Sequence, residues 1–149
     1  MDIYYKPISE SGKQMINYVC KYAPVELFKG FGQECAVLEE MPENFDKSDK
    51  IAHANLCGFG KSVIQAVLEG KVEELVLVNC CDSMRRVYDI IENTKKCKFL
   101  YMLDLPHEDN ECENIKFAQS ILRLKNAYER YSHRTFDREL FIKSFAKPE

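Results

Sequence analysis

The stretch that decides the fold runs from His53 to Asp89 and reads HANLCGFGKSVIQAVLEGKVEELVLVNCCDSMRRVYD. At its centre lies the apolar run 75–78 (LVLV), which has the length of a strand and the unbroken hydrophobicity of a strand buried on both faces of a parallel sheet. Helical spacing of apolar residues flanks this run, at Val63, Ile64, Val67 and Leu68 before it and at Met84, Val87, Tyr88 and Ile91 after it. The pattern predicts a helix, a buried strand and a second helix.

The rest of the chain repeats this alternation of strands and helices. Strands are expected over 15–20, 35–38, 73–79 and 98–103, and the segment 42–50 is expected to be a polar surface loop. Helices are expected to begin at Pro24, after Cys57, at Asp82 or Ser83, near Glu113 and at Thr135, the last with Leu140, Phe141 and Phe145 facing inward. Such alternation predicts an α/β fold, a three-layer open parallel sheet of the Rossmann or flavodoxin-like kind with about four strands.

Length and charge exclude several classes of protein. A chain of 149 residues fits one domain or one lobe of a larger protein. The net charge of -3, with no basic block, argues against nucleic acid as a partner. The apolar runs are too short to cross a membrane, and the N-terminus lacks a signal-peptide pattern. We therefore expect a soluble, cytoplasmic protein.

Seven cysteines are a high number for this length. The count is odd, and the adjacent Cys80 and Cys81 cannot easily pair with each other, so a reduced intracellular protein fits better than a disulfide scaffold. The chain contains no CxxC pair, which argues against zinc ribbons and thioredoxin-like motifs.

Two cysteine turns stand out as a candidate site. Cys57 lies in the glycine-rich turn CGFGKS, and Cys81 lies where the buried strand meets the next helix. In open α/β sheets ligands bind at the carboxyl ends of the strands, where both turns are expected to lie. A helix N-terminus also lowers the pKa of a thiol there, which favours Cys81 as a thiolate. Two converging thiolates indicate a metal or iron–sulfur site, and Cys80 is either core or a third ligand.

Other interpretations of the same residues remain open. The turn ends in Gly-Lys-Ser as in a phosphate-binding loop, but Asn55 stands where that loop needs glycine, and the segment 50–53 before it reads only weakly as a strand. Packing is the simpler explanation of Cys20, Cys97 and Cys112, whereas Cys35 is either core or ligand. Arg85 or Arg86, in the first turns of the helix, is either solvated or holds a phosphate or carboxylate. His53 and Glu26 are weaker candidates for polar roles.

Four segments in order give the chain a resemblance to a known family. They are 22–28 (YAPVELF, followed by Gly30 and Gly32), 55–58 (NLCG), 79–89 (NCCDSMRRVYD) and 103–106 (LDLP). Together they resemble the 2-hydroxyacyl-CoA dehydratase D-component family, which includes benzoyl-CoA reductase subunits and double-cubane cluster proteins. The later helices follow the order of the family too, so the resemblance covers nearly the whole chain.

The resemblance implies an oxygen-sensitive iron–sulfur cluster, either [4Fe-4S] or a double cubane, in a lyase of anaerobic metabolism. It implies an ATP-dependent activator protein that supplies single electrons, and an acyl-CoA substrate whose ketyl radical expels the hydroxyl group. By their matching positions, Cys57 and Cys81 are the implied cluster ligands, with Cys80 an adjacent candidate.

The chain departs from the family in one respect, because family members usually have two similar lobes and this chain resembles the N-terminal lobe alone. We expect residues 1–149 to form that single lobe, either as a fragment or as a short relative. A second lobe or a partner subunit would then complete the ligation. The alternatives are a non-catalytic module that binds a cluster or a partner, and an α/β domain without metal.

Overall fold

The computed structural model describes residues 15–38 and 42–145. Within them, four strands form one all-parallel sheet in the order β2-β1-β3-β4. The strands are β1 (Ile16–Tyr18), β2 (Cys35–Val37), β3 (Glu74–Val78) and β4 (Phe99–Leu103). The helices are α1 (Val25–Lys29), α2 (Ser48–Ile51), α3 (Gly58–Leu68), α4 (Asp82–Thr94), α5 (Glu111–Ser132) and α6 (Arg138–Lys143).

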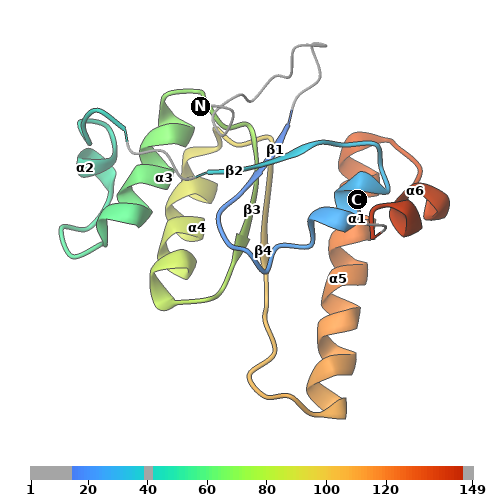
Figure 1. The fold of residues 1–149 in the computed structure, drawn as a ribbon. Coiled ribbons are helices and arrows are strands. Elements are labelled where there is room, and N and C mark those ends of the chain that lie inside the picture. The colour runs from blue at the N-terminus through green and yellow to red at the C-terminus, as the bar shows by residue number, and fades with distance from the viewer. Residues whose placement is uncertain (1–14, 39–41, 146–149) are drawn as a thin grey trace.

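Helices cover both faces of the sheet, which confirms the predicted three-layer α/β fold. The helices α3 and α4 lie on one face, and α1, α5 and α6 lie on the other (Figure 1). Alternate residues of the fully buried β3 serve the two layers: Leu75 and Leu77 pack in the cluster of α3 and α4, while Val76 packs with Leu124 and Tyr128 of α5. The unbroken apolar run 75–78 therefore contributes side chains to the hydrophobic cores on both faces of the sheet.

The strand order places a topological switch between β1 and β3. From β1 the chain moves to β2 on one side, and it then returns to add β3 and β4 on the other side. This is the order of the first four strands in flavodoxin-like folds, which bind ligands outside the carboxyl ends of the strands at such a switch. The loop that begins at Val19 and the loop that begins at Asn79 flank this point.

Three local predictions are wrong. The surface loop 42–50 contains the start of α2, which continues into the weakly strand-like segment 50–53. Cys81, rather than Asp82 or Ser83, is the N-cap of α4. The N-cap of α6 is Asp137 rather than Thr135, because the Asp137 carboxylate accepts hydrogen bonds from two free N–H groups of the first helical turn.

The side chains of α6 are also less buried than predicted. Leu140 and Phe145 are 41% and 60% exposed, and only Phe141 is partly buried. The helix is short and packs against α1 at the edge of the layer, where the ring of Phe141 meets that of Phe136 at 5.4 Å between centroids. An apolar stripe on so short a helix does not ensure that every member reaches the core.

A buried polar cluster fastens α5 at the amino end of β3. The hydroxyl of Tyr131 donates to Glu74 at 2.7 Å, and the hydroxyl of Tyr128 lies 3.3 Å from acceptors on both Glu74 and Gln33. Burial raises the pKa of the Glu74 carboxyl, while the two phenols oppose that rise. In the part of the chain that the structure describes, no helix is long and apolar enough to cross a membrane.

Candidate functional site

The candidate site lies at the carboxyl edge of the sheet. Cys80 and Cys81 follow β3, and Asp104 follows β4. The loops after β3 and β4 lie at the lower end of the sheet in Figure 1, where α4 and α5 begin. The side chain of Asn79 joins these two loops: its amide donates to Asp104 at 2.8 Å, and its oxygen accepts from the N–H of Leu105 at 2.8 Å.

Cys81 occupies the position that the sequence predicts, at the junction of β3 and α4. It is the N-cap of α4 in extended backbone conformation, and its side chain is exposed. Its thiol makes no capping hydrogen bond, although its carbonyl accepts from the N–H of Met84 at 3.1 Å. The sulfur at this helix start is therefore accessible from solvent.

Cys57 is the N-cap of α3, and its thiol does make the capping contact. The N–H of Gly60 lies 3.4 Å from the Cys57 sulfur. This backbone N–H is the main cause that lowers the pKa of the Cys57 thiol; burial opposes it, and a hydrogen bond with the Ser83 side chain lowers the pKa by a smaller amount. Because Ser83 belongs to the first turn of α4, the Cys57 sulfur lies beside the helix start that Cys81 caps.

The route of the chain to Cys57 differs from the prediction. The sequence predicts Cys57 at a turn that directly follows a strand, but α2 and the loop 52–56 separate it from β2. It reaches the carboxyl edge because α3 runs back antiparallel to the sheet and pairs with α4. The close approach depends on Gly60, where a Cβ atom would lie only 3.1 Å from the Val87 side chain.

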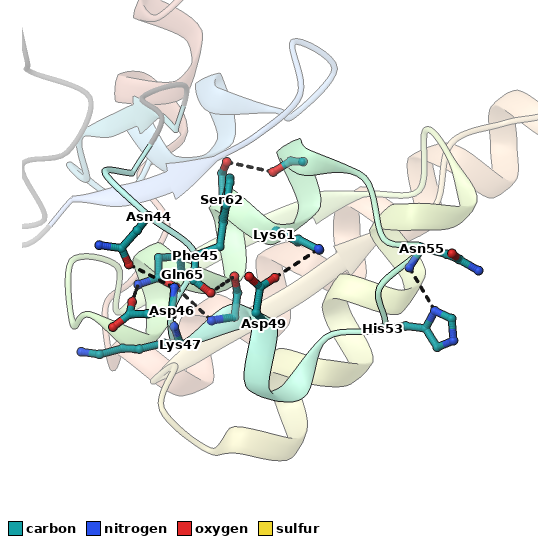
Figure 2. Close-up of polar contacts among 12 residues, drawn as sticks. Asn44, Phe45, Asp46, Lys47, Asp49, His53, Asn55, Lys61, Ser62 and Gln65 are labelled. Atoms are coloured by element: carbon teal, nitrogen blue, oxygen red, sulfur yellow. Dashed lines mark hydrogen bonds and ion pairs between the residues drawn. The ribbon is translucent and has the colours of Figure 1, made fainter.

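Figure 2 shows how the segment before Cys57 is held against α3. The buried side chain of Gln65 accepts from the N–H groups of Lys47 and Ser48 at 3.1 and 2.9 Å, and it donates to Asp46 at 2.8 Å. These bonds satisfy the N–H groups at the start of α2. Lys61 pairs with Asp49 at 3.1 Å on the same side.

His53 serves the same segment, because its Nδ1 accepts from the N–H of Asn55 at 3.1 Å within the exposed loop (Figure 2). The structure gives this histidine a local contact within the loop. Glu26 lies in the first turn of α1, partly exposed.

Cys80 and Cys20 meet at the switch between β1 and β3. Partial burial raises the pKa of the exposed Cys80 thiol to about 11, and the neighbouring thiols of Cys20 and Cys81 add to the rise. Cys20, for which the sequence favours packing, therefore lies beside Cys80 of the candidate site. The raised pKa makes Cys80 a weaker candidate for a thiolate ligand than Cys57.

The remaining cysteines lie elsewhere. Cys35 begins β2 and Cys97 precedes β4, so both are at the amino edge, and burial raises the pKa of each thiol to about 12. Cys112 is exposed in the first turn of α5. For Cys35, partial burial and a position at the opposite end of the sheet from Cys57 and Cys81 favour a packing role.

No group of three or more histidine, cysteine or acidic side chains in the described ranges 15–38 and 42–145 is arranged to hold a metal ion. The thiols of Cys57 and Cys81 are suitable donors for a soft metal, but these two alone do not make a complete ligand set.

Comparison with known protein families decides the relationship of this chain. It matches the family described as 2-hydroxyglutaryl-CoA dehydratase, D-component, over residues 20–147. The chain belongs to this D-component family. A search of curated proteins found no match. The match covers all four segments on which the sequence resemblance rests, so the family prediction is confirmed and the chain is a 2-hydroxyacyl-CoA dehydratase-type protein.

Two features of the site in this D-component family member were not predicted from sequence. The sequence indicates Ser83 only as a candidate helix cap, yet its side chain forms a hydrogen bond with the Cys57 thiol of the neighbouring helix. The sequence predicts Asn79 as the end of a strand, yet its side chain bridges the loops after β3 and β4. The sequence does place a polar residue, Asn79, directly after a buried strand, and this position could have indicated a role at the carboxyl edge. The contact of Ser83 depends on how α3 packs against α4, which the sequence does not show.

Proposed function

We propose that this D-component family member uses Cys57 and Cys81 to hold an iron–sulfur cluster that serves the dehydration of a 2-hydroxyacyl-CoA. The observation that carries the proposal is the position of the Cys57 thiol. It caps α3, accepts the N–H of Gly60 and contacts Ser83, two residues after Cys81. Two exposed thiols from different helices thus stand at one edge of the sheet.

The chemistry of these residues fits such a cluster. Iron–sulfur clusters are bound by cysteine thiolates, and hydrogen bonds to sulfur tune their potential. The lowered pKa of the Cys57 thiol favours the thiolate that ligation requires. Cys81 supplies a second accessible sulfur at a helix N-terminus, where the macrodipole favours negative charge.

The same residues suggest what completes the site. Two cysteines leave a cluster short of protein ligands, and Cys80, with its raised pKa, is the less suitable neighbour. We infer that a second lobe or a partner chain contributes the rest. The exposure of Cys57 and Cys81 supports this arrangement, since both sulfurs are accessible from outside this lobe.

When bound, the cluster would supply single low-potential electrons to the acyl-CoA thioester, after receiving them from an ATP-dependent activator protein. In that scheme the residues of this chain hold and position the cysteine ligands. Gly60 and Ser83 stabilise the Cys57 thiolate, and the contacts of Gln65 hold the preceding segment so that the thiol stays at the start of α3.

Anaerobic reconstitution tests the proposal. The unaltered chain is incubated with ferrous iron, sulfide and an excess of a small thiol, which takes the ligand positions that a second lobe or partner chain would fill; it is then desalted and assayed for protein-bound iron, sulfide and visible absorbance. We expect a brown protein with equal amounts of bound iron and sulfide. If a chain with native circular dichroism binds no iron, this lobe alone does not carry the site and the proposal for Cys57 and Cys81 fails in this form.

A further inference from the structure

A polar cavity lies beside the cysteine turns at the carboxyl edge. Its volume is about 400 Å³, and its walls come from the loop after β4, from one face of α5 and from the first turns of α4. The residues that matter for its chemistry are Asn79, Arg85, Asp104, Glu113, Lys116 and Arg123. The volume lies within the range of small-molecule sites, roughly 300–1,000 Å³.

The two carboxylates of the wall already have partners. Asp104 accepts the amide of Asn79 at 2.8 Å. Glu113 accepts from Lys116 and from the N–H of His107, both at 3.2 Å, and these contacts lower the pKa of its carboxyl. Both acidic groups are therefore engaged in holding the loop after β4.

The two arginines are less fully engaged. Arg123 donates through one Nη atom to the hydroxyl of Ser120 at 3.0 Å, which leaves most of its N–H groups for another acceptor. Arg85 lines the cavity from α4, and no hydrogen bond or ion pair ties its guanidinium to the rest of the described chain. Two guanidinium groups thus reach one cavity from two different helices.

We propose that this cavity binds an oxyanion group of a small molecule, a phosphate or a carboxylate, through Arg85 and Arg123. Guanidinium groups form paired, charge-assisted hydrogen bonds with both kinds of anion. Arg85 lies one helical turn after Cys81, in the same helix that Cys81 caps. No cysteine lines the cavity, so the proposal does not depend on cluster binding.

Calorimetric titration of the metal-free full chain at low ionic strength tests the proposal, with inorganic pyrophosphate and glutarate as separate probes. We expect at least one probe to bind and the affinity to fall as salt is added. Binding of pyrophosphate indicates a phosphate-bearing ligand, and binding of glutarate alone indicates a carboxylate. Failure of both probes to bind would overturn the proposal.

Matched variants locate the binding. Arg85→Gln and Arg123→Gln should each weaken binding about ten-fold or more, the usual effect of losing a hydrogen bond to a charged group. Arg86→Gln and Arg130→Gln remove exposed charges from the same two helices outside the cavity and should leave affinity nearly unchanged. Equal weakening by Arg85→Gln and Arg86→Gln would show a nonspecific charge effect and overturn the proposal.

Two further checks keep the outcome clear. Circular dichroism establishes whether each variant is folded. If a glutamine variant is not folded, the lysine variant at the same position replaces it. Lysine keeps the charge and loses only the planar guanidinium, so binding should still weaken. The protein is free of iron throughout. A chain that binds iron but neither probe therefore contradicts only the cavity proposal, and a chain that binds a probe but no iron contradicts only the cluster proposal.

Discussion

The cysteines at the two edges of the sheet differ in exposure and in the pKa of their thiols. At the carboxyl edge, Cys57 and Cys81 are exposed helix caps, and hydrogen bonds lower the pKa of the Cys57 thiol. At the amino edge, burial raises the pKa of the Cys35 and Cys97 thiols to about 12. One sheet thus holds a thiol with a lowered pKa, Cys57, at one end and two thiols with strongly raised pKa values at the other.

The difference arises from the direction of the strands. In a parallel α/β fold, the helix N-termini meet the carboxyl ends of the strands, so free N–H groups gather there. Gly60 provides such a group to Cys57. At the amino edge, burial raises the pKa of the Cys97 thiol by more than the backbone hydrogen bonds of Phe99 and Leu75 lower it. The hydrogen bonds and burial of each cysteine therefore indicate its function better than the number of cysteines does.

The largest expected effect is in thiol alkylation. At pH 8 a thiol with a pKa of about 12 is ionised to only about one part in 10⁴, whereas one below its ordinary value of 9.0 is at least about one-tenth thiolate. We expect iodoacetamide to modify Cys57 at least about 100-fold faster than Cys35 or Cys97, as followed by mass spectrometry of the native protein.

The pH dependence sharpens that comparison. The rate at Cys57 should reach half of its plateau below pH 9.0, because hydrogen bonds stabilise the thiolate. The rates at Cys35 and Cys97 should still be rising at the highest pH at which the protein stays folded. Similar rates at all three cysteines near pH 8 would remove the distinction between the two edges.

A smaller effect is expected from two glycines of the Cys57 turn. Gly60→Ala should destabilise the protein by about 1–3 kcal/mol, because the new methyl group would crowd Val87 and Leu56 where α3 packs on α4. Gly58→Ala is the matched control: nothing lies within 4 Å of its Cβ position, and alanine favours the helix by up to about 1 kcal/mol. Urea unfolding measures both, and equal stability of the two variants would mean that α3 and α4 are not this close.

The smallest effect is expected at the amino edge, from Glu74→Gln. Burial raises the pKa of the Glu74 carboxyl in the folded protein above its value in the unfolded chain. The stability that comes from the protonated carboxyl is therefore fully present below the pKa of the unfolded chain. It is lost as the pH rises through the pKa of the folded protein. Glutamine does not titrate, so stability of the variant relative to wild type should increase over that window by about 1 kcal/mol or less. Urea unfolding from pH 4 to 7 checks this, and a constant difference would contradict the raised pKa.

The sequence allows most of the fold to be predicted because hydrophobic periodicity is a local property. The run 75–78 and the stripes on either side of it define β3, α3 and α4 without reference to the rest of the chain. The errors occur where tertiary contacts decide. The helix α2 has little apolar pattern of its own and depends on Gln65, which is 17 residues away from Ser48. Asp137, rather than Thr135, is the cap of α6 because its carboxylate accepts the N–H groups of Glu139 and Leu140.

The candidate site could be predicted in part for the same reason. The position of Cys81 follows directly from the strand that precedes it, whereas the position of Cys57 depends on the packing of α3 against α4. Sequence also could not show that the capping N–H contact would form at Cys57 and not at Cys81, since that depends on side-chain orientation at each helix start. The pairing of Arg85 with Arg123 across one cavity likewise depends on tertiary structure.

The most direct test of the central claim, that the carboxyl edge carries the cluster ligands, is the iron content of four single variants after anaerobic reconstitution. Serine keeps the size of cysteine but offers a hard, poorly ionised oxygen in place of a soft sulfur. We predict that bound iron falls sharply in Cys57→Ser and Cys81→Ser and hardly changes in Cys97→Ser and Cys112→Ser, with native circular dichroism in all four. Equal retention of iron by all four variants would contradict the claim.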